Sequence, residues 1–218
     1  TIIALSVVYS QEKSKNNENA VIPTSAGTTT TTTTTTTSVP TTEPSNEPWD
    51  NPITYNVTLW PRLQPDLTGL YIFTGMSSVV FRCVEKTNLI LIHSNKLNMT
   101  KEPTLTALGS KPAPAIASIV MHTKTQYMAI HLKEELTAGE SYELYTEFIG
   151  ELADDLGGFY RSEYYENGVK KVVATTQMQA TDARKAFPCF DEPAMKAVFH
   201  ITLYHDPATV ALSNGVVI

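Results

Sequence analysis

The sequence has little charge and few cysteines, and each shortage excludes a class of protein. Only 17% of its 218 residues are charged, and acidic residues outnumber basic ones by 22 to 16. Nucleic-acid-binding domains usually carry a basic face, so this composition argues against a nucleic-acid partner. Two cysteines are too few for a disulfide-stapled small fold or a four-cysteine zinc site. With 42% hydrophobic residues, the chain can still bury one sizeable core.

Metal-binding motifs are also absent. No His-Glu-x-x-His pattern occurs, so the zinc-binding pair that this motif places on one helix face is missing. The acidic stretch 151–155 lacks the alternating Asp and Asn ligands of a calcium loop. It predicts a solvated turn with hinge glycines at Gly157 and Gly158. We therefore expect that this chain itself binds no metal.

Composition divides the chain into three zones, of which the first two lie before residue 49. Residues 1–9 are apolar but too few to cross a bilayer, which takes about 20 apolar residues. They fit the remnant of a transmembrane signal anchor, a signal-peptide remnant or a buried strand. Residues 10–48 contain an unbroken threonine run, Thr28 to Thr37, and almost no large apolar side chains. This composition predicts a disordered extracellular stalk, either O-glycosylated or an unmodified repeat tract.

The third zone, residues 49–218, has the pattern of an all-β domain. Tyr55, Val57 and Leu59 alternate with polar neighbours, as on a half-buried strand. Similar short runs predict further strands over 70–84, 88–93, 116–121, 127–132, 142–148, 171–179 and 197–204. No long amphipathic helix is indicated. The predicted fold is a large, curved, saddle-like β-sandwich that follows the threonine-rich stalk.

Two Asn-x-Thr sequons, at Asn56 and Asn98, predict N-glycosylation and favour an extracellular location. Asn56 lies on the strand face opposite Tyr55, so we expect its side chain to point to solvent. Cys83 and Cys189 each lie among apolar residues, which favours buried thiols. A disulfide between them stays open at this point.

The segment 174–184, Ala-Thr-Thr-Gln-Met-Gln-Ala-Thr-Asp-Ala-Arg, holds the strongest candidate binding site. Gln177 and Gln179 are two residues apart, so in a strand their side chains would share a face. Their amide oxygens can accept hydrogen bonds from a cation such as the terminal ammonium group of a peptide. The alternative interpretation is an ordinary polar strand face.

Asp191 and Glu192 are a second pair of carboxylates, which raises the possibility of a glycosidase. The two residues are adjacent, so on an extended backbone their side chains diverge, and Pro193 follows directly. A turn that fixes the backbone, paired with Arg184, is the better interpretation.

Several longer segments resemble a known family. One is Gly150–Tyr164, which reads Gly-Glu-Leu-Ala-Asp-Asp-Leu-Gly-Gly-Phe-Tyr-Arg-Ser-Glu-Tyr. Another is the block from Val173 to Pro193, with its Thr-Gln-Met-Gln and Phe-Pro-Cys-Phe-Asp-Glu-Pro sequences. Together with 69–73 and 92–100, these segments resemble the amino-terminal β-domain of the membrane-bound zinc aminopeptidases. Residues 1–13 are similar to the end of the membrane anchor and the start of the stalk in that family.

The resemblance implies the amino-terminal part of a type II, single-pass plasma-membrane enzyme that releases amino-terminal residues from peptides. It implies that Gln179 helps to hold the substrate's amino group and that Gln177 lines the same pocket. The parent enzyme would use Zn²⁺. The family's Gly-x-Met-Glu-Asn and His-Glu-x-x-His motifs do not occur here, so no catalytic residue or zinc ligand is assigned.

The expected partners follow from the same resemblance. They are the amino terminus of a peptide substrate, the plasma membrane, and the catalytic domain that this sequence lacks. A homodimer of the parent enzyme stays open. The alternative function is a non-catalytic binding module at the cell surface.

Overall fold

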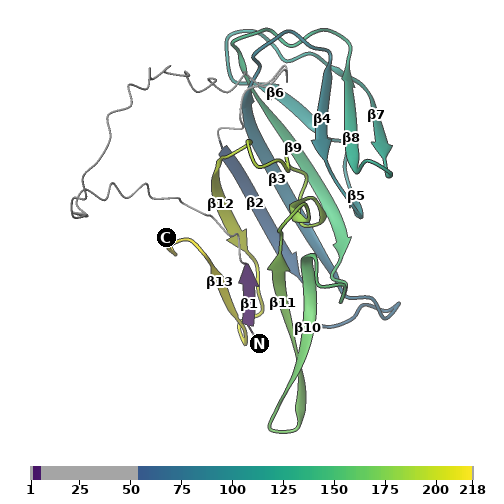
Figure 1. Ribbon diagram of the computed structural model, residues 1–218, viewed down its shortest axis with the longest axis vertical. Coiled ribbons are helices and arrows are strands. Elements are labelled where there is room, and N and C mark those ends of the chain that lie inside the picture. Colours follow the sequence, from purple (N-terminus) through teal and green to yellow (C-terminus); the bar gives the residue numbers. More distant parts are fainter. Residues whose placement is uncertain (1, 6–53, 218) are drawn as a thin grey trace, which may run out of the picture. The chain divides into compact units, whose positions relative to one another are not determined.

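A computed structural model describes residues 2–5 and 54–217, which fold almost entirely as β-strands (Figure 1). This confirms the predicted all-β class. Each strand predicted from the sequence is present, with ends that shift by a few residues. The stalk predicted over 10–48 lies outside the described residues. So does the anchor remnant predicted over 1–9, apart from Ile2–Leu5, which form strand β1.

The largest sheet has six strands. In spatial order its main path is β12 (Val198–Leu203), β2 (Thr54–Pro61), β3 (Ile72–Arg82), β9 (Ser141–Glu151) and β5 (Leu97–Met99), and β6 (Thr104–Ala107) also pairs with β9. β2, β3 and β9 are antiparallel neighbours, whereas β12 is parallel to β2. Strand β2 has the predicted alternation, because Tyr55, Val57 and Leu59 are buried and Asn56 is exposed.

Two smaller sheets complete the domain. The three-stranded sheet has the order β4 (Leu89–His93), β8 (Tyr127–Leu132) and β7 (Ile116–His122). The four-stranded sheet has the order β10 (Gly158–Glu166), β11 (Val169–Gln177), β1 and β13 (Val210–Ser213). In Figure 1 the three-stranded sheet lies beside one end of β3 and β9, and the β10–β11 hairpin lies towards their other end.

A two-residue turn closes the β10–β11 hairpin. Glu166 and Val169 are the last paired residues, so Asn167 and Gly168 form the loop. Both have positive φ, 51° and 76°. Paired positive φ values are those of a type I′ turn, whose twist matches that of the flanking strands.

Aromatic rings join the six-stranded sheet to its neighbours. Phe73 on β3 meets Phe159 on β10 edge to face, with 5.1 Å between ring centroids. Phe81, also on β3, meets Phe190 at 5.9 Å. Within the large sheet itself, Tyr55 of β2 stacks on Phe199 of β12 at 4.9 Å. The core therefore includes residues of the large sheet, of β4 and β8 in the three-stranded sheet, and of the hairpin and loop that follow β9.

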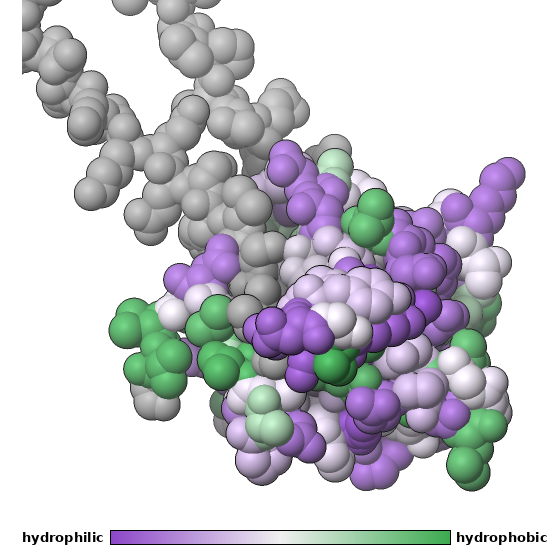
Figure 2. All heavy atoms as spheres, turned by 90° about the horizontal axis from the view of Figure 1, so that it is seen from below, coloured by the Kyte–Doolittle hydropathy of each residue, from purple (hydrophilic) through white to green (hydrophobic). Residues whose placement is uncertain are grey.

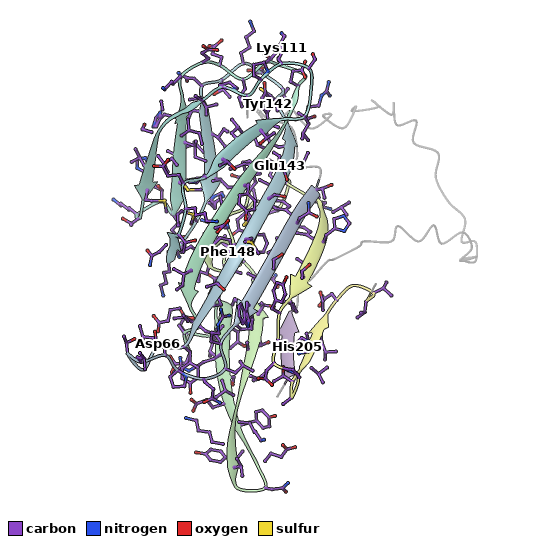
Figure 3. The ribbon with its side chains drawn as sticks, turned by 180° about the vertical axis from the view of Figure 1, so that it is seen from behind. Asp66, Lys111, Tyr142, Glu143, Phe148 and His205 are labelled. Carbon is purple, nitrogen blue, oxygen red and sulfur yellow. The ribbon has the colours of Figure 1, made fainter. Side chains whose placement is uncertain are left out.

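Glycines on β3 and β9 make room for two of the buried rings. Gly75 pairs with Phe148, and Gly150 pairs with Phe73, in the antiparallel ladder of the two strands. A Cβ on either glycine would lie 2.5 Å from ring atoms of the paired phenylalanine. Figure 3 shows Phe148 midway along β9. Glycine suits these two positions because each phenylalanine ring covers the backbone opposite it and leaves no room for a side chain.

Candidate functional site

Strand β11 leads directly into the segment that carries the two candidate glutamines. Its last paired residue, Gln177, lies opposite Gly158 of β10. Ala174 and Thr176 face the core and are buried, whereas Gln177 is exposed. Figure 1 shows the strand ending beside the short 3-10 helix η1 (Ala183–Lys185).

The prediction that β11 runs through Gln179 is wrong, because the strand ends at Gln177. The backbone N–H of Asp182 donates to the carbonyl oxygen of Met178 (2.9 Å), and this bond closes a turn over residues 178–182. We call it the Gln179 turn. Gln179 is exposed within it, and its peptide bond to Ala180 is cis. The two glutamines therefore do not share a strand face, although both are exposed near the end of β11.

Buried glycines pack against one side of the Gln179 turn. A Cβ on Gly157 would lie 2.8 Å from the carboxylate of Asp182, and one on Gly158 would collide with Cβ of Lys185. Gly158 also has a positive φ of 70°. The preceding acidic residues Asp154 and Asp155 are exposed, as predicted. Both glycines are buried and allow close packing against the turn and η1.

A buried ion pair lies just after the Gln179 turn, at η1. Nε of Arg184 donates to Oδ2 of Asp191 at 2.8 Å, and the side chains are only 10% and 12% exposed. The backbone N–H of Arg184 donates to the same carboxylate oxygen (3.3 Å), and Nη2 donates to the carbonyl oxygen of Asp191 (3.3 Å). This confirms the prediction that Asp191 lies in a turn that pairs with Arg184. Charge-assisted bonds of this kind are stronger than neutral ones.

His93 and Gln126 complete the contacts of this pair. The backbone N–H of Asp191 donates to Nδ1 of His93 (3.2 Å), and Nη1 of Arg184 donates to Oε1 of Gln126 (3.2 Å). His93 is 5% exposed and its ring lies over Tyr127, with 4.1 Å between centroids. Burial and the neighbouring Arg184 cation both lower the pKa of His93. The imidazole therefore stays neutral, as an acceptor at Nδ1 must.

The loop after η1 is fixed to two sheets. His93 and Cys189 exchange backbone hydrogen bonds of 2.9 and 3.1 Å, and Asn95 donates its backbone N–H to the carbonyl oxygen of Arg184 (2.9 Å). The backbone N–H of Phe190 donates to the hydroxyl of Tyr55 on β2 (3.0 Å). Burial raises the pKa of this phenol well above its usual value, so it remains a hydroxyl.

Sequence reasoning did not find His93 and Gln126. Both lie far from Arg184 in the sequence, and only the pairing of β4 with β8 brings them together. A positive φ of 60° at Gln126 marks the turn before β8, but the sequence shows no glycine or asparagine there. The missed residues thus belong to the framework around the site.

The remaining predicted residues lie elsewhere. Asn98, like Asn56, is exposed, on β5. Cys83 and Cys189 are buried thiols and form no disulfide. Burial raises the pKa of both thiols, which disfavours the reactive thiolate form.

The Gln179 turn can bind but offers no hydrolytic chemistry by itself. An amide side chain presents a neutral oxygen acceptor and two N–H donors. Within residues 54–217, no group of three or more His, Cys, Asp or Glu side chains could hold a metal ion. The described part of the chain also has no helix long and apolar enough to cross a membrane.

Comparison with known proteins gives a consistent match. The family described as Peptidase M1 N-terminal domain matches residues 51–218. Aminopeptidase N of Rattus norvegicus is 56% identical over 224 residues, which cover 98% of this chain and 23% of the rat protein. Aminopeptidase N of Homo sapiens is 51% identical, with the same coverage of both chains. Human aminopeptidase Q is 36% identical over 75% of this chain and 17% of its own length.

This chain thus spans less than a quarter of the length of these curated relatives. The match nevertheless includes β2 to β13, the Gln179 turn and the Arg184–Asp191 pair. Residues 69–73, 92–100, 150–164 and 173–193, which resembled the zinc aminopeptidases in the sequence, lie within the family match, whereas residues 1–13 lie outside it. The chain belongs to the peptidase M1 family, and residues 51–218 correspond to the family's N-terminal domain.

Proposed function

We propose that this chain is the amino-terminal part of a cell-surface zinc aminopeptidase and that Gln179 helps to bind the amino terminus of the peptide substrate. Gln177 lines the same pocket from the end of β11. The single observation that carries the proposal is the position of Gln179, exposed on a turn that packs against two buried glycines and leads into η1 with its buried ion pair.

A neutral acceptor suits this task. The amide oxygen of Gln179 can accept a hydrogen bond from an ammonium group, which carries a full charge, and such bonds contribute about 1.5–3 kcal/mol. A fixed acceptor also sets how far the peptide's amino group lies from the bond to be cleaved. A peptide with a blocked amino terminus lacks that charge, so the proposal predicts an exopeptidase.

Hydrolysis itself is assigned to the catalytic domain that this sequence lacks. In this proposal, residues 54–217 supply binding and orientation of the substrate. A cell-surface location is supported by the two sequons, since Asn56 and Asn98 are both exposed. A membrane anchor at residues 1–9 and a stalk at 10–48 are further parts of the proposal.

The test is the Gln179→Ala substitution in the intact enzyme. We expect kcat/KM for an aminoacyl anilide to fall by about tenfold or more, since a bond to a charged group is lost. Steady-state kinetics at several substrate concentrations would measure KM and kcat separately.

Thr181→Ala is the matched control, because Thr181 is exposed in the same turn. It should leave both kinetic constants close to those of the wild type. Unchanged kinetics for Gln179→Ala would remove the role assigned to Gln179. A purified 218-residue chain that binds a surface protein tightly would favour the alternative, a non-catalytic binding module.

A further inference from the structure

The Gln179 turn and the Arg184–Asp191 pair are linked through a continuous set of backbone hydrogen bonds. Asp182 donates to Met178, Lys185 donates to Asp182 (3.0 Å), and Ala186 donates to Ala183 (2.9 Å). Arg184 lies within these overlapping turns. Any movement of its backbone must therefore be accompanied by movement of the turn that carries Gln179.

The Arg184 side chain is fixed in turn by groups from two separate segments, and a third segment holds Asp191. Asp191 accepts from its Nε and backbone N–H, and Gln126 accepts from Nη1. His93 holds the Asp191 backbone from β4. The ion pair is nearly dry, so it is screened little by water and keeps a defined geometry.

We propose that Arg184 and Asp191 are positioning residues, whose buried ion pair fixes the Gln179 turn and thereby sets the affinity for the substrate's amino group. Neither residue touches the substrate. This inference rests on the proposed function of Gln179, and it adds the part of the domain that controls the site. Surface ion pairs nearby, such as Lys185 with Asp182 (3.2 Å), are more exposed and contribute less.

The first experiment measures the turn directly, in the 218-residue chain. Asp191→Asn should raise the hydrogen-exchange rate of the Asp182 amide, which donates within the Gln179 turn. Glu147→Gln is the matched control, since it removes an ion pair of equal length (2.8 Å, to Lys101) on β9, away from the turn. An exchange rate for Asp191→Asn that equals the control would overturn the inference.

The second experiment measures function in the intact enzyme. Asp191→Asn should raise KM for a free-amine anilide by about tenfold, because small displacements of a binding group have large effects. The same change should add little to Gln179→Ala, since both act on one contact. Effects that multiply in the double variant would show that Asp191 acts on something other than Gln179, and would overturn the inference.

A milder variant keeps the test valid if Asp191→Asn prevents folding. Removing one partner of a buried ion pair can unfold a domain, whereas Gln126→Asn only shortens the acceptor that contacts Arg184. Asparagine also tolerates the positive φ of 60° at this position. Gln126→Asn should raise the Asp182 exchange rate and KM in the same direction by a smaller factor. No change in either would count against the positioning role.

The two failures can be told apart. If Gln179→Ala raises KM but Asp191→Asn changes neither KM nor exchange, the inference fails and the proposed function stands. If Asp191→Asn raises exchange while Gln179→Ala leaves KM unchanged, the proposed function fails. The role of the ion pair in substrate binding then fails too, and only the conclusion that the ion pair stabilises the Gln179 turn stands.

Discussion

His93 is the buried residue whose charge state matters most for the loop after η1. Its Nδ1 accepts the Asp191 backbone N–H, which requires that nitrogen to be unprotonated. Burial and the Arg184 cation lower the pKa of His93 in the folded state. In the unfolded chain the pKa of this histidine is about 6.5. As pH falls below that value, the unfolded state takes up a proton first. This contribution to stability is therefore present above pH ~6.5 and lost below it.

Urea unfolding at pH 7.5 and pH 5.5 would check this expectation. The free energy of unfolding should be lower at pH 5.5, and His93→Gln should reduce the difference between the two pH values. His122→Gln, at an exposed position on β7, is the control and should keep the wild-type difference. A wild-type pH difference that survives in His93→Gln would contradict the account.

Sequence reasoning worked for residues that interact locally and failed for distant ones. Arg184 and Asp191 are seven residues apart, and the turn residues between them made their pairing predictable. His93 lies 98 residues from Asp191, and no pattern in the sequence connects them. Gln179 is exposed, but the strand predicted for it was wrong, because β11 ends at Gln177 and a turn closed at Met178 follows.

Among the elements, the contact between β3 and β9 gives the clearest test of packing. Gly150→Ala would place a Cβ 2.5 Å from the buried Phe73 ring and 3.0 Å from Leu97. Overpacking of this kind costs about 1–3 kcal/mol, so we expect a lower free energy of unfolding. The same reasoning applies to Gly75→Ala against Phe148.

Thermal unfolding compares these variants with Gly215→Ala. A Cβ at Gly215 meets nothing within 4 Å, so this control should keep the wild-type Tm. A Gly150→Ala variant as stable as the control would mean that Phe73 can move aside without cost, and would contradict the packing described here.

Strand prediction was clearest where one face is buried, and it missed β5, β6, β10 and β13. β9 and β2 both alternate regularly between buried and less buried residues, which gives a clear period of two. Most of β10 is exposed on both faces, so it shows no such period. β5 and β6 are short and exist because β9 offers an edge to pair with. The formation of such strands depends on pairing with a distant strand, which the local sequence pattern does not show.

For the whole molecule, exposed apolar residues near β13 predict self-association. Val210 and Leu212 are 56% and 50% exposed and lie on one face of this strand, and Val216 and Val217 are also exposed. Figure 2 shows hydrophobic residues at both sides of the face it draws, among hydrophilic ones. Large exposed apolar patches usually mark surfaces that another chain or domain covers.

Analytical ultracentrifugation of the 218-residue chain should therefore show concentration-dependent dimers or larger species. The double variant Val210→Thr and Leu212→Thr should shift the distribution towards monomer. Val169→Thr changes a residue of equal exposure at the hairpin and serves as control. A chain that is monomeric at every concentration tested would contradict this expectation.

The central claim, that Gln179 binds the substrate's amino group, is tested most directly by changing that group. Two inhibitors of the intact enzyme would be compared, one with a free amine and one with a hydroxyl in its place. Inhibition constants for wild type and Gln179→Ala give the preference for the amine in each. We predict that the preference falls by about tenfold or more in the variant, the size of a hydrogen bond to a charged group. An equal preference in both proteins would contradict the claim.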